Sequence, residues 1–218
     1  ILTQERGKTP IITQWNYFNQ QGLASHRFSF TGYKGGRFLD FSPVTKTNAR
    51  SLLQKIQFVP NVFFFDRVSA SSLYFAEHFI EKGTIVFFEP SVKKIDLQFM
   101  KCVKASNIIK FSEQRMPDIS FAEQFPDKLY IQTLGSEGLR YKFPGSDWKH
   151  LSTIENSNIV DTAGAGDWTT AAFLNALPLE PFYKIESEKI EAALIEAQKI
   201  GALSCSYAGA RGMMEEYD

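Results

Sequence analysis

A chain of 218 residues can bury a sizeable core, and its 44% hydrophobic and 22% charged residues are ordinary globular values. Because 24 Lys and Arg residues balance 24 Asp and Glu residues, the composition lacks the basic excess typical of nucleic-acid-binding proteins. We find no apolar run long enough to cross a bilayer and no signal peptide, so the sequence predicts a cytoplasmic protein with no nucleic-acid or membrane partner.

The first part of the chain, residues 1–58, has the pattern of a β hairpin and a connecting segment. Residues 11–18 and 27–30 are rich in apolar, β-branched and aromatic side chains, and the Asn-Gln-Gln-Gly run at 19–22 is a natural turn between them. This pattern differs from the rest of the chain, so we place a boundary before residue 59.

Residues 59–218 alternate short apolar runs with amphipathic ones. The expected strands are 62–65, 84–88, 107–110 and 129–133. The expected helical segments are 71–82, 96–104, 120–124, 168–177 and a last one from about 187 to 201. Strands that are apolar throughout and separated by helices are typical of a parallel sheet covered on both faces.

The most informative segment is Asp161-Thr162-Ala163-Gly164-Ala165-Gly166-Asp167, just before a mostly apolar helix. A glycine-rich turn that opens a helix favours an anion, because unpaired N–H groups and the helix dipole both attract negative charge. Asp167 stands at the mouth of that helix, where a carboxylate can accept a proton from a group that attacks the anion. The alternative is a packing turn in which Asp161 or Thr162 caps the helix; two acids around the glycines favour phosphoryl transfer.

A second glycine-containing turn, residues 133–139, follows the apolar strand at 129–133. Gly135 and Gly138 allow the backbone to approach a phosphate closely. The alternative is a plain β-turn between two neighbouring strands.

In this order, the two segments resemble the nucleotide loop and the C-terminal signature of the ribokinase-like (PfkB-type) carbohydrate kinases. Residues 161–174 match every constrained position of that signature. The resemblance implies an α/β fold with a three-layer α/β/α, doubly wound and mostly parallel sheet, and a partial β lid near the N-terminus. It further implies ATP-dependent transfer of the γ-phosphoryl group to a hydroxyl of a sugar or nucleoside-like acceptor.

The resemblance also implies roles for single residues. The catalytic set contains a base and an anion hole for the transferring phosphoryl group: Asp167 as the base, with Gly164, Ala165 and Gly166 as the hole. The cofactor-binding set lies along the phosphates of ATP: Thr133, Gly135, Gly138 and Ser112.

The expected magnesium site departs from the family pattern. Ser112 and Arg115 stand where the family has the Asn and Glu of an Asn-x-x-Glu motif that organises Mg²⁺ and phosphate. Glu113 is expected to compensate through a water molecule, with a solvated surface acid as the alternative. Asp161 is the second acid assigned to the metal.

Two further segments match the family in part. Glu89 stands after a strand at the place of the Asp in the family's Asp-Pro-Asn run. Residues 205–210 resemble the loop near the adenine and a monovalent-cation site, such as one for K⁺; a helix C-cap at Gly209 is the alternative.

The family's Gly-Gly-x-x-Asn sugar-binding signature does not occur before Val62. The chain is therefore expected to be a segment of a longer enzyme, a partial kinase completed by another chain, or a degenerate member that binds nucleotide without transferring phosphate. Its start at Ile1 favours truncation or processing. A sheet that lacks strands exposes an apolar edge, so we expect a homodimer or a complementing chain.

Overall fold

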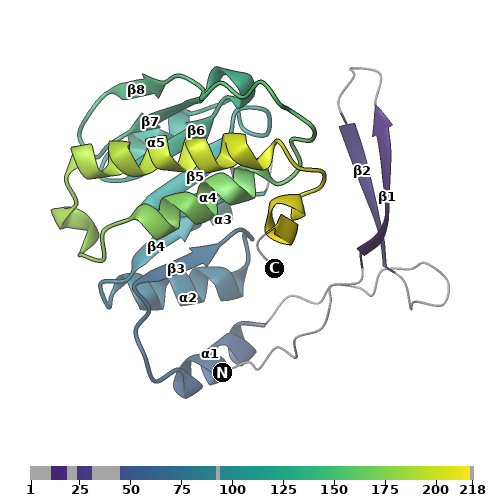
Figure 1. Ribbon diagram of the computed structural model, residues 1–218. Helices are drawn as coiled ribbons and strands as arrows, with labels where there is room; N and C mark the ends of the chain where they lie inside the picture. Colours follow the sequence, from purple (N-terminus) through teal and green to yellow (C-terminus); the bar gives the residue numbers. More distant parts are fainter. Residues whose placement is uncertain (1–10, 19–23, 31–44, 92–93, 217–218) are drawn as a thin grey trace. The chain divides into compact units, whose positions relative to one another are not determined.

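The computed structural model describes residues 11–18, 24–30, 45–91 and 94–216 (Figure 1). The chain divides into two compact units, Ile1–Val44 and Thr45–Asp218. In the first unit, strands β1 (Ile11–Phe18) and β2 (Ala24–Phe30) pair antiparallel, from Ile11 opposite Phe30 to Phe18 opposite Ala24. The predicted pairing of two strands is confirmed, with the second strand beginning at Ala24 and not at residue 27. The predicted turn at 19–22 lies outside the described residues, and the function of this part as a lid stays a prediction.

Within the described residues, the second unit is built on a six-stranded sheet whose strands lie in sequence order from β3 to β8. The strands are β3 (Val62–Phe65), β4 (Ile85–Phe88), β5 (Ile108–Ser112), β6 (Leu129–Thr133), β7 (Leu139–Lys142) and β8 (Trp148–Leu151). Strands β3 to β6 are parallel, and β7 and β8 continue the sheet antiparallel. The four expected strands are confirmed. Strand β7 belonged only to the alternative in which residues 133–139 are a plain turn between strands, and β8 was not expected.

Three of the five α-helices described in this unit begin at a side chain that caps their first N–H groups. The helices are α1 (Lys46–Lys55), α2 (Ala70–Ile80), α3 (Leu97–Lys104), α4 (Ala165–Ala176) and α5 (Ser187–Ser204). Ser69 accepts a hydrogen bond from the Ser72 N–H at the start of α2, and Asp96 accepts from the Gln98 and Phe99 N–H groups at the start of α3. Such caps each stabilise a helix by about 1 kcal/mol.

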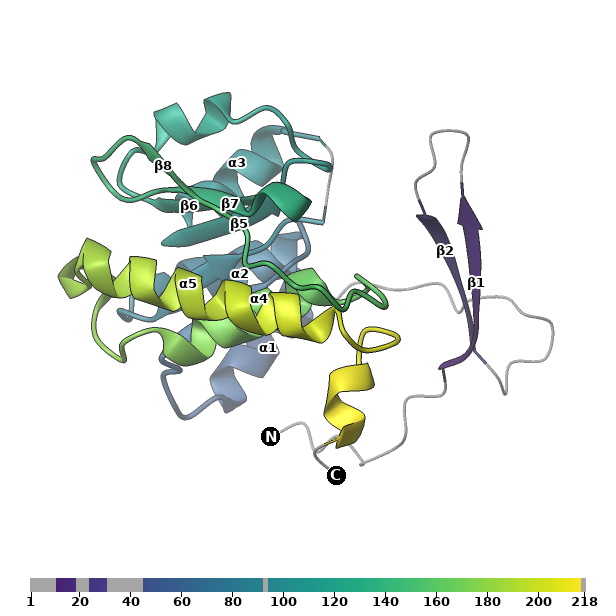
Figure 2. The ribbon, with the colours of Figure 1, turned by 45° about the horizontal axis from the view of Figure 1, so that its top comes forward.

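Both faces of the sheet are covered, as the turned view shows (Figure 2). Alternate residues of β4 point to opposite faces. Val86 and Phe88 pack with α2 and α3, whereas Ile85 and Phe87 pack with α4 and α5. The predicted three-layer α/β/α fold with a mostly parallel sheet is therefore confirmed.

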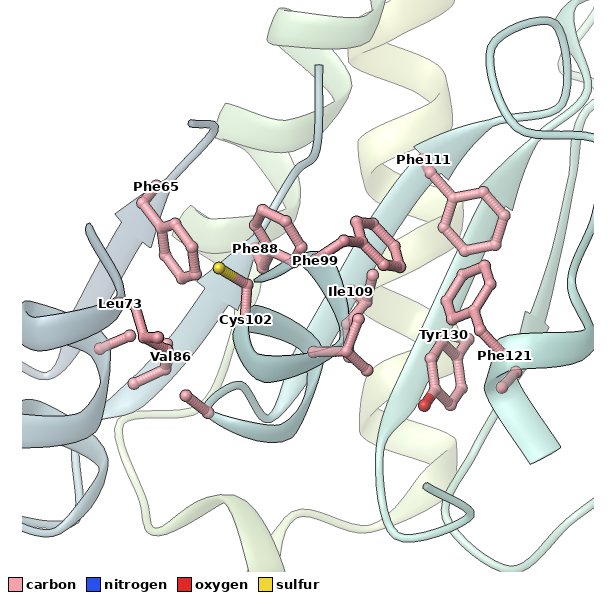
Figure 3. Packing of buried hydrophobic residues seen from close by; sticks show 14 of the residues in the cluster. Phe65, Leu73, Val86, Phe88, Phe99, Cys102, Ile109, Phe111, Phe121 and Tyr130 are labelled. Carbon is pink, nitrogen blue, oxygen red and sulfur yellow. The ribbon is translucent and has the colours of Figure 1, made fainter. Parts of the chain in front are cut away.

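Aromatic side chains fill the layer between the sheet and α3 (Figure 3). Phe88 stacks on Phe65 with ring centroids 4.6 Å apart, and Phe99 meets Phe121 edge to face at 5.2 Å. Phe88, Phe99 and Phe121 are buried. At about 1.5–3 kcal/mol for each buried side chain of this size, these rings hold α3 against the sheet.

Helix α1 lies in the second compact unit and packs on α2, although no helix was predicted there. The boundary between a lid-like segment and a catalytic domain, placed between residues 58 and 59, stays a prediction. The structure itself divides into compact units between residues 44 and 45. In the part of the chain that the structure describes, no helix has the length and apolar character needed to cross a membrane.

Candidate active site

The acid-glycine loop at 161–167 is pressed against the segment that follows α5. Gly164 is the N-cap of α4 and adopts a left-handed conformation with φ of +81°. A Cβ atom at this position would lie 2.8 Å from both Cα and Cβ of Ala210. Conformation and space therefore both require glycine at residue 164.

Helix α4 begins three residues earlier than the sequence predicts, because the backbone turns helical directly after Gly164. Asp167 is thus in the first turn of the helix and not ahead of it. Its side chain is exposed, and within the described residues it forms no hydrogen bond or ion pair. The carboxylate is available to accept a proton.

Backbone donors at this helix start lack partners. The N–H groups of Gly164, Gly166 and Asp167 have no acceptor among the described residues. Ala165, which the sequence analysis placed in the anion hole, donates its N–H to the Thr162 carbonyl at 3.2 Å. Free N–H groups at the positive end of a 12-residue helix form a ready site for an anion.

Asp161 holds the loop in place. One carboxylate oxygen accepts from the Ala163 N–H at 3.0 Å, and the other accepts from the Gly209 N–H at 2.9 Å. Its own N–H donates to the Cys205 carbonyl at 3.1 Å. Asp161 therefore ties the loop to the segment after α5.

Because α5 ends at Ser204 with Cys205 as its C-cap, the alternative of a helix C-cap at Gly209 is wrong.

The turn between β6 and β7 contains the predicted nucleotide-binding residues. Gly135 and Gly138 have φ of +62° and +96°. A Cβ atom on Gly138 would overlap the Leu151 carbonyl oxygen, so the turn packs closely on the strand β8. The turn thus joins neighbouring antiparallel strands, as in the simpler alternative, and its contact with a nucleotide stays a prediction.

The predicted residues from separate strands meet at one edge of the sheet. Ser112 and Thr133 are paired in register at the ends of β5 and β6, and the Glu113 N–H donates to the Thr133 carbonyl at 2.9 Å. The carboxyl ends of parallel strands are where open α/β sheets bind ligands. The acid-glycine loop reaches the same edge, because the side chain of Lys110 in β5 contacts Gly166.

A buried ionic cluster beneath the loop was missed by the sequence analysis. The Lys110 ammonium lies 2.6 Å from a Glu89 oxygen and donates to the Gly166 carbonyl at 3.2 Å. Thr170 donates to the other Glu89 oxygen at 2.7 Å, and it also contacts the Gly166 carbonyl at 3.0 Å. Only 3% of Lys110 is exposed. The sequence did contain a signal for this cluster: a lysine stands inside an apolar strand, and an acid follows the strand before it.

The two acids assigned to a metal are placed differently. Both oxygens of Asp161 accept backbone N–H groups, whereas Glu113 is exposed. Among the described residues, no group of three or more His, Cys, Asp or Glu side chains is arranged to hold a metal ion. The residues present do not form a protein cage for Mg²⁺, and the roles of Asp161 and Glu113 in metal binding stay predictions.

The fold and this loop define a kinase-like α/β protein. The pfkB family carbohydrate kinase profile matches residues 85–216, which is more than half of the chain. The chain therefore belongs to the pfkB family of carbohydrate kinases, and the resemblance seen in the sequence is confirmed. No curated protein sequence matches it significantly.

Solved structures share the fold at low sequence identity. Thermotoga maritima ribokinase is 18% identical with a TM-score of 0.61, and the match covers 91% of this chain and 64% of that chain. Vibrio cholerae fructokinase is 19% identical with a TM-score of 0.63, covering 92% and 69%. Giardia lamblia ribokinase is 16% identical with a TM-score of 0.65, covering 90% and 67%. The chain spans less than two thirds of the Thermotoga enzyme.

Proposed function

We propose that this chain carries the nucleotide and catalytic part of an ATP-dependent kinase, which transfers the γ-phosphoryl group to a hydroxyl of a sugar or sugar-like molecule. The single observation that carries the proposal is the start of α4. Free N–H groups of Gly164, Gly166 and Asp167 lie there beside an exposed Asp167 carboxylate that has no partner among the described residues.

This arrangement fits the chemistry of phosphoryl transfer. The reaction needs positioning and stabilisation of charge on the phosphoryl oxygens, and backbone donors at a helix N-terminus supply both. The acceptor oxygen attacks the γ-phosphorus, the bond to the β-phosphate oxygen breaks, and the hydroxyl proton passes to Asp167. ADP and the phosphorylated acceptor are the products.

The nucleotide is proposed to lie along Thr133, Gly135, Gly138 and Ser112 at the shared edge of the sheet. Solved relatives support ATP or ADP as the nucleotide: Arabidopsis thaliana ribokinase was solved with ribose and ATP. Vibrio cholerae fructokinase was solved with fructose, ADP and calcium, and a double mutant of it with potassium. Mg²⁺ bound by the nucleotide would neutralise phosphate charge.

A second function is a degenerate or partial kinase-fold protein that binds nucleotide or a partner chain without catalysis. Ser112 and Arg115 at the expected Mg²⁺–phosphate motif favour it. So does the edge of the described sheet at β3, where Phe58, Val59 and Phe64 are 66%, 51% and 44% exposed. A complementing chain or a second copy could cover these side chains.

Turnover of the 218-residue chain with ATP, Mg²⁺ and a panel of sugars and nucleosides separates the two functions. Asp167→Asn should lower turnover on the order of 10²–10⁴-fold and leave nucleotide binding in place, because the amide cannot accept the proton. Asp147→Asn is the matched control, since Asp147 is also exposed but lies between β7 and β8. Turnover that survives Asp167→Asn would defeat the mechanism; nucleotide binding without turnover on any acceptor would favour the second function.

A further inference from the structure

The buried cluster below the acid-glycine loop is not explained by packing. The Lys110 side chain is 4% exposed and lies in the apolar strand β5, where a methionine would fill similar space. Replacing a buried ion pair by apolar side chains is often neutral or stabilising. The placement of the ammonium therefore needs a reason other than stability.

That reason lies in the peptide group between Gly166 and Asp167. Its carbonyl oxygen accepts from Lys110 at 3.2 Å, and the Thr170 hydroxyl oxygen, whose proton goes to Glu89, lies 3.0 Å from it. No peptide bond among the described residues is cis, so the C=O and N–H of this peptide point in opposite directions. Holding the Gly166 carbonyl against the sheet thus aims the Asp167 N–H away from it, and this N–H is one of the free donors.

The ammonium also acts on the strength of that donor. A cation bonded to a carbonyl polarises the peptide, and hydrogen bonds in such a chain strengthen one another. The Asp167 N–H consequently becomes a better donor to an anion than an ordinary backbone amide.

Glu89 completes the cluster from the end of β4. Its two carboxylate oxygens accept from Lys110 at 2.6 Å and from Thr170 at 2.7 Å, so one carboxylate fixes both side chains beside the Gly166 carbonyl. The Glu89 N–H in turn donates to the Phe65 carbonyl at 3.0 Å. The first turn of α4 is thereby connected to three neighbouring strands of the sheet.

We infer that Lys110, held by Glu89, is a positioning residue that aims the Asp167 N–H and the Asp167 carboxylate at the transferring phosphoryl group. The inference rests on the proposed kinase function. Lys110 is not placed in contact with the substrate; it acts through the Gly166–Asp167 peptide.

Substitution of Lys110 and Glu89 distinguishes a role in positioning the catalytic group from a role in stabilising the fold. Lys110→Met leaves Glu89, whose side chain is 21% exposed, without its cation, so this variant is expected to lose stability. Adding Glu89→Gln removes that unpaired charge and should restore a wild-type urea midpoint. The double variant should nevertheless keep a kcat reduced on the order of 10²-fold, with a smaller change in KM for the acceptor, because the catalytic group is displaced.

Lys128→Met is the matched control, because Lys128 is also a buried lysine, 8% exposed, but lies before β6 and pairs with Asp127. It should leave kcat unchanged. A double variant with restored stability and wild-type kcat would overturn the inference.

A nuclear magnetic resonance readout tests the inference even where the chain shows no turnover. The ¹H–¹⁵N signal of Asp167 is followed while inorganic phosphate is added to the wild-type chain and to the double variant. In the absence of phosphate, we expect the Asp167 amide signal of the double variant to lie at a different position from that of the wild-type chain. In the titration, phosphate should bind to the double variant at least about 10-fold more weakly, since one oriented donor is lost. An unchanged Asp167 signal and unchanged phosphate affinity would refute the positioning role, whereas absent turnover alone would count only against the proposed kinase reaction.

Discussion

Gly164→Ala gives the sharpest test of how the loop is held. The substitution places a Cβ in a left-handed backbone with φ of +81°, which is unfavourable for alanine by about 1–2 kcal/mol. The same Cβ would lie 2.8 Å from Ala210 Cα and Cβ, an overlap that adds about 1–3 kcal/mol as the neighbouring backbone shifts. Together these effects predict a loss of about 2–5 kcal/mol in the free energy of unfolding, measured by urea denaturation.

Gly166→Ala, two residues along the chain, is the matched control for stability. A Cβ there meets nothing within 4 Å, and Gly166 is not among the glycines with positive φ. Because alanine favours a helix over glycine, this variant should be neutral or more stable by up to about 1 kcal/mol. If Gly164→Ala destabilises the chain no more than Gly166→Ala does, the close approach to Ala210 and the strained turn are both refuted.

The remaining predictions concern stability in the sheet and between the helices. Lys110→Met should lower the free energy of unfolding by about 3–5 kcal/mol, and adding Glu89→Gln should recover most of this loss in urea denaturation. Gly201→Ala should be destabilising by about 1–3 kcal/mol because its Cβ overlaps Thr169 Oγ1, and the loss should shrink in a Thr169→Ala background. Burial raises the pKa of the Cys102 thiol from 9.0 to about 12, with a further contribution from the charge of Glu77. The folded chain therefore holds this proton more tightly, and the resulting stabilisation, complete below pH 9, is lost between pH 9 and 12. Cys102→Ala should flatten the urea-measured stability over that pH window; an equal slope in both proteins would contradict the assignment.

Local patterns predicted most of the sheet. The apolar run at Leu129–Thr133 is a strand with the predicted bounds, because a strand buried on both faces needs an apolar residue at nearly every position. Strand β8 gave no comparable signal, since its Lys149 and His150 are exposed at the edge of the sheet. Helix α1 was missed because it has a single buried residue, Ala49, and its other positions are polar or only partly covered.

Of the candidate site, only the part formed by consecutive residues could be predicted from the sequence. The acid-glycine run identified the helix start, because glycines in a turn before a helix have a direct backbone consequence. The Lys110 contacts could not be predicted in this way, since they join residues 21 and 56 positions apart, and Thr170 reaches Glu89 across 81 positions. Only the pairing of β4 with β5 and the return of α4 to the same edge bring these groups together.

The same cluster bears on the choice between a kinase and a non-catalytic remnant. A chain that needed only a stable fold would gain little from a lysine that is buried in β5 and paired with a glutamate at the end of β4, because an apolar pair serves stability at least as well. Here Lys110, bound by Glu89, contacts the Gly166 carbonyl, whose peptide presents one of the three free N–H groups at the acid-glycine loop. Its contacts therefore match the needs of a precisely held anion site, which a kinase and a nucleotide-binding remnant both use, so turnover with Asp167→Asn is the measurement that separates the two.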